Sequence, residues 1–124
     1  MKKKILIVDD NMDMVKILTY FLSSREFDVR GAYRGDEGLT LARDFVPDLA
    51  LLDVCMPGMS GHELCTSMKQ DDKLKNIPIV FTTVEGEPED ISFGYSLGAE
   101  AYMVKPFHLS DLHDIIMSIL ENSL

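Results

Sequence analysis

The sequence has few cysteines and no long apolar run, and each shortage excludes a class of protein. Only two cysteines, Cys55 and Cys65, occur in 124 residues. They form neither a CxxC pair nor a zinc-binding spacing, so we expect two free thiols in a reducing compartment. No stretch of about 18 apolar residues is present, which excludes a membrane-spanning helix.

Basic residues are also in short supply. The chain has 12 Lys and Arg against 21 Asp and Glu, a formal net charge of −9. An acidic surface repels phosphate backbones, so we expect no direct contact with nucleic acid and favour a basic partner or a bound cation. The basic start at 1–4 leads into an apolar run that stops at Asp9, too short for an export signal. We therefore expect a cytoplasmic protein that does not contact membranes.

The composition predicts one folded domain. Hydrophobic residues make up 46% of the chain, which excludes a disordered segment. A chain of 124 residues is long enough to bury a sizeable core. We expect a single domain over residues 1–124, with no linker or output domain in this stretch.

Short apolar runs alternate with segments of helical periodicity. The runs typical of buried strands lie at 5–8, 27–33, 48–53, 79–83 and 101–104. Helical spacing follows each run, at 14–22, 35–45, 60–72, 88–98 and from 109 to the end of the chain. The fourth of these helices contains Gly94, which weakens it by about 1 kcal/mol relative to Ala. This alternation predicts an α/β fold, a doubly wound parallel sheet of five strands covered by helices on both faces.

Polar residues stand at the ends of four of the predicted strands. Asp9 and Asp10 follow the first, Asp53 ends the third, Thr83 ends the fourth and Lys105 follows the fifth. An acid after a strand is commonly only a helix cap. Five groups at corresponding positions are harder to explain as caps, because the carboxyl ends of parallel strands meet at one edge, where ligands bind.

The chemistry of these five groups suits phosphoryl transfer. Carboxylates a few ångströms apart repel by about 1 kcal/mol per pair in water and about 4 kcal/mol at an effective dielectric of 20. A hard cation relieves this repulsion, and oxygen ligands suit Mg²⁺. Lys105 adds positive charge and Thr83 a hydroxyl donor. Asp53 is then a candidate nucleophile that forms an acyl phosphate.

The chain resembles the response-regulator receiver domain of two-component signalling over essentially its whole length. The segments that carry the resemblance are 5–10, 53–61, 78–83, 98–99 and 105–107. The resemblance implies a flavodoxin-like sheet with strand order 2-1-3-4-5. It also implies that Asp53 is the phosphorylated residue, assisted by Mg²⁺. Asp10 would bind the metal directly, Asp9 would act mainly through water, and the backbone carbonyl of Cys55 would complete the protein ligands.

The same resemblance implies a switch. Thr83 would follow the phosphoryl group inward, and Tyr102, three residues before Lys105, would change rotamer with it. Thr82 competes for the hydroxyl role, but counting from Pro78, and separately back from Lys105, selects Thr83.

Three residues beside the site are candidate modulators. Cys55 and Glu85 occupy positions that tune acyl-phosphate lifetime in this family. Val84 departs from the family pattern, which usually has Ala or Gly after the threonine, and its β-branched side chain is expected to narrow access to the phosphate pocket.

The implied partners are proteins. A histidine kinase or phosphotransfer protein would donate the phosphoryl group. A downstream target would bind the face formed by the fourth helix, the fifth strand and the fifth helix, through which related receivers often dimerise. The chain would not be an enzyme in its own right, beyond its autocatalytic phosphorylation and dephosphorylation.

Three rival interpretations remain. A dehalogenase-like phosphatase would need a second acid two residues after Asp53, where Cys55 stands, and a cap for which this chain has no room. A flavin-binding module would place its phosphate against Asp9 and Asp10, which would repel it. A receiver-like interaction module without phosphorylation would have no need of the five polar groups.

Overall fold

Strands and helices alternate along the chain. The computed structural model describes residues 1–84 and 88–122. Within this part of the chain the elements are β1 (Lys4–Val8), α1 (Met12–Ser24), β2 (Asp28–Ala32), α2 (Gly35–Phe45), β3 (Leu49–Asp53), α3 (Gly61–Lys69), β4 (Ile79–Thr83), α4 (Pro88–Ser96), β5 (Ala101–Val104) and α5 (Leu109–Asn122). None of the described helices has the length and apolar character needed to cross a bilayer.

All five strands are parallel and lie in the order β2-β1-β3-β4-β5, which confirms the predicted sheet. The chain moves outward from β1 to β2 and then crosses back to β3, so the order reverses between β1 and β3. In their pairing Val8 lies opposite Leu52. Asp9 and Asp53, the next residue on each strand, therefore emerge side by side at the switch point, where ligands bind in such sheets.

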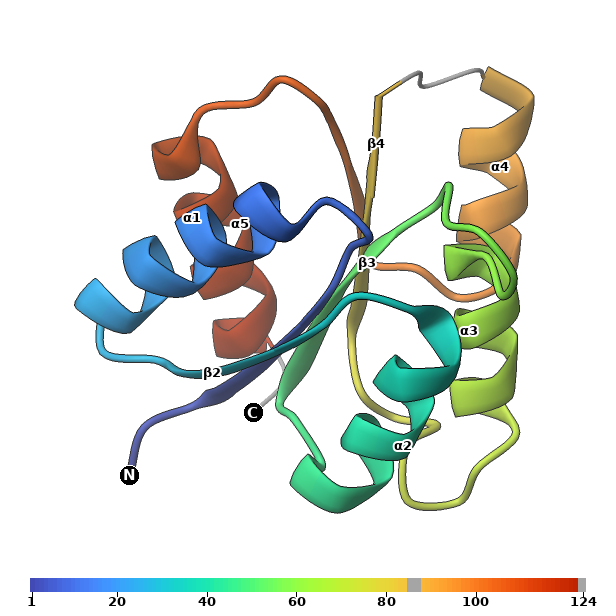
Figure 1. Ribbon diagram of the computed structural model, residues 1–124, viewed down its shortest axis with the longest axis horizontal. Coiled ribbons are helices and arrows are strands. Elements are labelled where there is room, and N and C mark those ends of the chain that lie inside the picture. Colours follow the sequence, from blue (N-terminus) through green and yellow to red (C-terminus); the bar gives the residue numbers. More distant parts are fainter. Residues whose placement is uncertain (85–87, 123–124) are drawn as a thin grey trace.

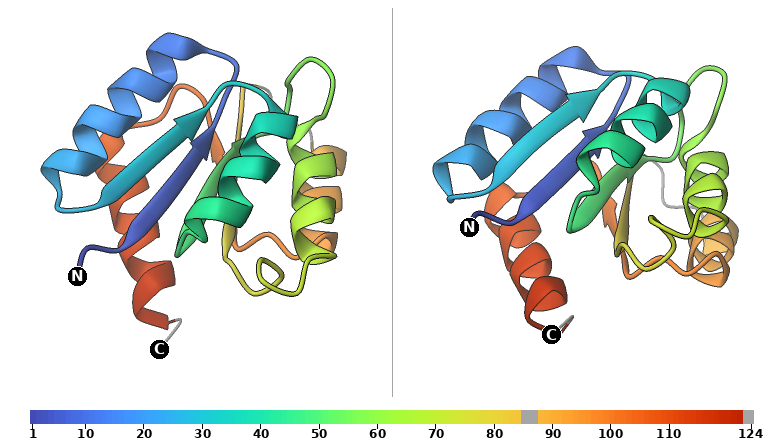
Figure 2. Two further views of the ribbon diagram at one scale, coloured as in Figure 1. Left: turned by 60° about the horizontal axis from the view of Figure 1, so that its bottom comes forward. Right: turned by 90° about the horizontal axis from the view of Figure 1, so that it is seen from below.

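The helices cover both faces of the sheet. Figures 1 and 2 show α1 and α5 on one face and α2, α3 and α4 on the other. Alternate side chains of β1 enter two separate cores, with Ile5 and Ile7 on the α1/α5 face and Leu6 and Val8 on the opposite face. Each is almost completely buried, which stabilises the fold by about 1.5–3 kcal/mol per side chain. Burial on both faces explains why the strands read as continuous apolar runs.

The residue that caps the N-terminus of α1 affects how Asp10 is interpreted. The Asn11 side chain accepts a hydrogen bond from the Met14 N–H at 3.1 Å, so Asn11 is the N-cap. Asp10 and Asp13 are residues of a type that also caps helices. Since Asn11 fills this role, capping does not explain Asp10.

Helix α3 ends earlier than predicted, at Lys69 rather than near residue 72. The Asp71 carboxylate accepts a hydrogen bond from the Lys73 N–H at 2.9 Å, and the Asp71 carbonyl accepts from the Leu74 N–H. Aspartate side chains that bond to nearby backbone compete with helical hydrogen bonds. The chain therefore turns at 70–76 and buries Leu74 before β4 begins.

The loop after β3 is fixed by a close approach at Gly61. Ser60 caps α3 in a capping box with Glu63. The Gly61 N–H donates to the Val54 carbonyl at 3.0 Å. A Cβ at position 61 would overlap the Asp53 carbonyl oxygen and lie 3.0 Å from the Cα of Val54. The start of α3 thus packs directly on the end of the strand that carries Asp53.

We expect Gly61→Ala to lower the free energy of unfolding by more than about 3 kcal/mol, because the clash is with backbone that cannot move without moving β3. Urea denaturation measures this loss. The matched control is Gly58→Ala, where φ is +76° and no atom lies within 4 Å of the added Cβ. The control should lose only about 1–2 kcal/mol of left-handed strain. Equal losses would show that the contact at Gly61 is not tight.

Candidate functional site

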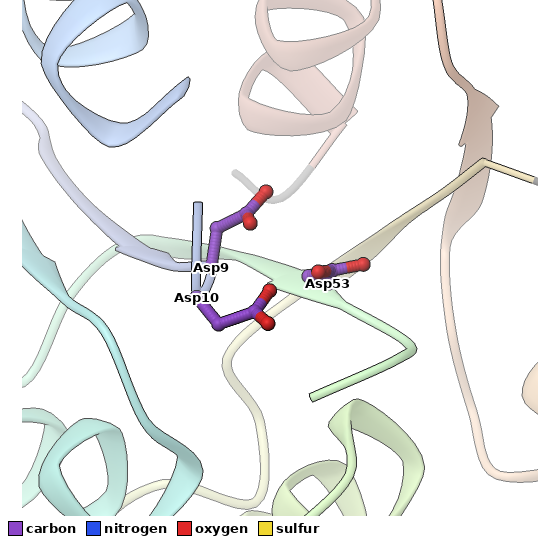
Figure 3. A group of neighbouring side chains, drawn as sticks. All are labelled: Asp9, Asp10 and Asp53. Atoms are coloured by element: carbon purple, nitrogen blue, oxygen red, sulfur yellow. The ribbon is translucent and has the colours of Figure 1, made fainter. Parts of the chain in front are cut away.

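Three carboxylates meet at the switch point of the sheet. Asp9 and Asp10 come from the turn after β1, and Asp53 is the last residue of β3 (Figure 3). One oxygen from each lies within 4.8 Å of the others. Asp9 is only 2% exposed and Asp53 5%, whereas Asp10 is exposed. The structure therefore brings together the three acids that the sequence singled out, with two of them largely removed from water.

Lys105, directly after β5, supplies the countercharge. Its Nζ lies 2.7 Å from Asp9 Oδ2 and 3.7 Å from Asp53 Oδ1. The other oxygen of Asp9 accepts the Asn11 N–H at 2.9 Å, so Asp9 is held on both sides. The sequence placed Lys105 at the site in a role toward Asp53. The structure adds that its closer partner is Asp9.

The surroundings of Asp53 raise the pKa of its carboxyl group above the value in water. Burial of the side chain, and then the negative charge of Asp9, raise the pKa of Asp53 from its ordinary value of 3.8 to about 7. The Lys105 ammonium and the Cys55 N–H oppose this shift, and a hydrogen bond with Asp10 adds to it. The carboxylate therefore titrates near neutral pH, and a further positive charge would favour its ionised form.

The acid cluster is chemically suited to a hard divalent cation. Three carboxylate groups close enough to share one ion, one of them open to solvent, match the oxygen ligands and retained waters that Mg²⁺ prefers. A cation here would offset the mutual repulsion of Asp9, Asp10 and Asp53. The Cys55 carbonyl, two residues beyond Asp53, remains a predicted further ligand.

Thr83 and Tyr102 share one face of the sheet. Phe81 pairs with Tyr102, and both pack in the core on the α3/α4 side. Because side chains alternate along a strand, Thr83 points to the same face as Phe81 and Thr82 to the opposite one. Both threonines are buried. The placement of Thr83 on the Tyr102 face agrees with its selection from the sequence.

The predicted modulators differ in their surroundings. Cys55 is exposed, and its N–H donates to Asp53 Oδ1 at 3.4 Å. Both cysteines are free, as predicted. Val84 is 68% exposed, so its side chain projects largely into solvent rather than into the protein interior. Glu85 lies outside the described residues.

No sequence pattern singled out His62, which the structure places against Tyr102. The His62 Nε2 and the Tyr102 hydroxyl lie 2.6 Å apart, across 40 positions of the chain. No spacing rule connects the second residue of α3 with the middle of β5, so only the packing of these elements reveals the contact.

We expect Asp53→Asn to raise the free energy of unfolding by roughly 1–3 kcal/mol at about pH 8 and to change it little at about pH 4. The pKa of Asp53 is about 7 in the folded protein, whereas in the unfolded chain it is near 4. The folded state thus binds more protons between these values and loses stability as the pH rises through them. Urea denaturation without divalent ions measures the effect.

Asp71→Asn is the contrasting control. Hydrogen bonds from the Lys73 N–H and from Arg43 lower the pKa of Asp71, so its ionised form favours the folded state. Asp71→Asn should therefore lower stability above about pH 4, opposite in sign to Asp53→Asn. An effect of Asp53→Asn that does not vary with pH would contradict the assigned titration.

Comparison with known proteins identifies the family. The model of the response regulator receiver domain matches residues 5–117. The chain is 38% identical to the alkaline phosphatase synthesis transcriptional regulatory protein PhoP of Bacillus subtilis, with 99% of this chain and 50% of that protein covered. It is 34% identical to the phosphate regulon transcriptional regulatory protein PhoB of Rhizobium meliloti, with 99% and 54% covered. The chain thus spans about half the length of these relatives.

Solved structures agree with this assignment. The chemotaxis protein CheY4 of Vibrio cholerae superposes with a TM-score of 0.87 at 29% identity, with 100% of both chains covered. A CheY-like receiver domain protein of Methanospirillum hungatei gives a TM-score of 0.93 at 28% identity, with 99% of this chain and 97% of that chain covered. Family match, sheet order and acid cluster agree: the chain belongs to the response regulator receiver domains of two-component signalling.

Proposed function

We propose that the chain, over residues 1–124, is a phosphorylation-dependent switch that accepts a phosphoryl group on Asp53. The observation that carries the proposal is the placement of Asp53. It is a buried carboxylate within 4.8 Å of two further acids and 3.7 Å from the Lys105 ammonium. Receiver domains bind Mg²⁺ at such an acidic cluster. The donor is a histidine kinase or a phosphotransfer protein.

Each residue of the site has a separate role in the transfer of the phosphoryl group to Asp53. A carboxylate oxygen of Asp53 attacks the phosphorus, the bond from phosphorus to the donor nitrogen breaks, and the donor imidazole keeps the electron pair. Asp10 and Asp53, with the Cys55 carbonyl, would hold Mg²⁺, and Asp9 would act mainly through water. When bound, Mg²⁺ neutralises the charge that develops on the phosphoryl oxygens.

Three other groups serve the acyl phosphate. Lys105 moves its positive charge from the acids to a phosphoryl oxygen, a short step because it already lies between Asp9 and Asp53. Thr83 donates its hydroxyl to another of these oxygens, and Tyr102, on the same face of the sheet, changes rotamer in response. Thr83 and Tyr102 together carry the signal from the site toward α4.

The output surface is the face formed by α4, β5 and α5. Tyr95 on α4 and Val104 on β5 are large apolar side chains that are exposed on these elements. Exposed apolar groups of this kind are typical of protein interfaces. A downstream protein, or a second copy of this chain, binds this face when Asp53 is phosphorylated. Two relatives are named as transcriptional regulatory proteins, which supports a downstream partner in signalling rather than in metabolism.

Mass measurement after incubation with acetyl phosphate tests the proposal. We expect a gain of one phosphoryl group that requires Mg²⁺ and is lost in Asp53→Ala. The matched control is Asp72→Ala, which removes an almost fully exposed carboxylate and should label like the parent protein. Labelling without Mg²⁺, or labelling of Asp53→Ala, would contradict the proposed site, and sustained hydrolysis of phosphate esters would point to a phosphatase instead.

Val84 is expected to slow phosphoryl entry. Its β-branched side chain follows Thr83 directly and is 68% exposed. Val84→Ala should label severalfold faster, and a fivefold gain corresponds to a barrier lower by about 1 kcal/mol. The gain should be larger for a phosphorylated protein donor than for acetyl phosphate, because a bulky donor is more easily obstructed by a side chain beside Thr83. Unchanged rates with both donors would show that Val84 does not limit access.

A further inference from the structure

The ring of Tyr102 lies in an aromatic cluster between β4, α3 and α4. Its centroid is 5.2 Å from that of Phe81 on β4 and 5.6 Å from that of Tyr95 on α4. The ring packs against the core on the α3/α4 face and is half-buried. In the structure, Tyr102 is therefore turned inward, toward α3 and α4.

Two features of this chain fit that inward position. The first is His62 on α3, whose Nε2 lies 2.6 Å from the Tyr102 hydroxyl. The His62 ring is itself held edge-on against two aromatic rings, with centroids 4.8 Å from Phe81 and 5.1 Å from Phe93. Because Phe81 and Phe93 hold the His62 ring in place, its Nε2 stays within hydrogen-bond distance of the Tyr102 hydroxyl.

The second feature is Gly94 on α4. A Cβ at this position would overlap the hydroxyl and ring atoms of Tyr102. The glycine that weakens α4 by its low helix propensity thus leaves the space into which the tyrosine ring fits. The sequence indicated only that Gly94 weakens α4. The structure adds that a glycine here leaves room for the Tyr102 ring.

The geometry points to His62 as a positioning residue that holds Tyr102 in its inward rotamer before phosphorylation, in a slot that Gly94 leaves open. In the described part of the chain, His62 packs on Tyr102, Phe81 and Phe93, away from the acid cluster in the sequence of contacts that leads from β5 to α3. It acts through Tyr102, so it sets the resting equilibrium of the switch rather than the chemistry. This consequence for switching depends on the roles of Asp53 and Tyr102 proposed above.

The rotamer of Tyr102 gives the direct test. NMR of protein with ¹³C-labelled tyrosine rings, with the Tyr102 signal assigned by Tyr102→Phe, reports the inward and outward populations without any ligand. One hydrogen bond lost in His62→Leu should shift this equilibrium outward by about fivefold. His62→Gln, whose amide reaches the position of Nε2, should retain much of the inward population. Ser67→Ala, at the same α3–α4 groove, is the neutral control.

Gly94→Ala distinguishes the effect of filling the space around the Tyr102 ring from the effect of helix propensity on α4. Alanine favours the helix, so stability alone predicts a more stable α4. The overlap with the Tyr102 ring predicts instead that the ring is driven outward even with His62 present. An inward Tyr102 in Gly94→Ala, or equal populations in His62→Leu and Ser67→Ala, would overturn the inference.

Beryllofluoride with Mg²⁺, a phosphoryl mimic, links the rotamer to the site. In the proposed switch Thr83 and Tyr102 move inward with the phosphoryl group, so the mimic should favour the inward rotamer that His62 already stabilises. His62→Leu should therefore weaken binding of the mimic by up to about fivefold, and this effect should vanish in the Tyr102→Phe background. An equal effect in both backgrounds would mean that His62 does not act through Tyr102. Failure of beryllofluoride to bind the unmodified protein would contradict the proposed function, whereas the ligand-free rotamer comparison would still test the role of His62.

Discussion

Asp9 and Asp53 carry negative charge to a sheet edge that little water reaches, and the Lys105 ammonium lies 2.7 Å from the first and 3.7 Å from the second. The ammonium pairs with both acids and lies closer to Asp9. Burial of Asp53 and the negative charge of Asp9 outweigh the ammonium and raise the pKa of Asp53 to about 7. A site with this excess of negative charge is chemically suited to a divalent cation.

The fold makes this arrangement stable enough to persist. Strands β1 and β3 are buried on both faces, and their parallel register fixes Asp9 beside Asp53. Gly61 lets the start of α3 pack on the backbone of Asp53, so the strand end cannot drift away from the cluster. The hydrophobic core thus holds like charges together that would separate in water, and that stored repulsion is what a bound cation relieves.

The same sheet connects the site with α4. Thr83 and Tyr102 lie on the face covered by α3 and α4, and the ring of Tyr102 occupies a slot between His62 and Gly94. His62, Phe81 and Tyr95 pack around this ring, and none of them belongs to the acid cluster of Asp9, Asp10 and Asp53. In the mechanism that we propose, the chemistry at Asp53 and the resting position of Tyr102 therefore depend on different side chains.

Local sequence determined the elements and most of the site. The apolar runs and helical periods predicted the strands and helices to within a few residues, except at the end of α3, where the Asp71 side chain competes with the helix. The strand-end positions of Asp10, Asp53 and Lys105 identified the cluster, because parallel strands bring their carboxyl ends to one edge.

Only the tertiary structure decided how these groups pair. That Lys105 lies closer to Asp9 than to Asp53, that Asn11 rather than Asp10 caps α1, and that His62 meets Tyr102 depend on the packing of distant segments. The hydrophobic periodicity of a sequence indicates on which face of its own helix or strand a residue lies. It carries no information on which residue of another element will lie opposite, because that contact is fixed by the way the layers pack.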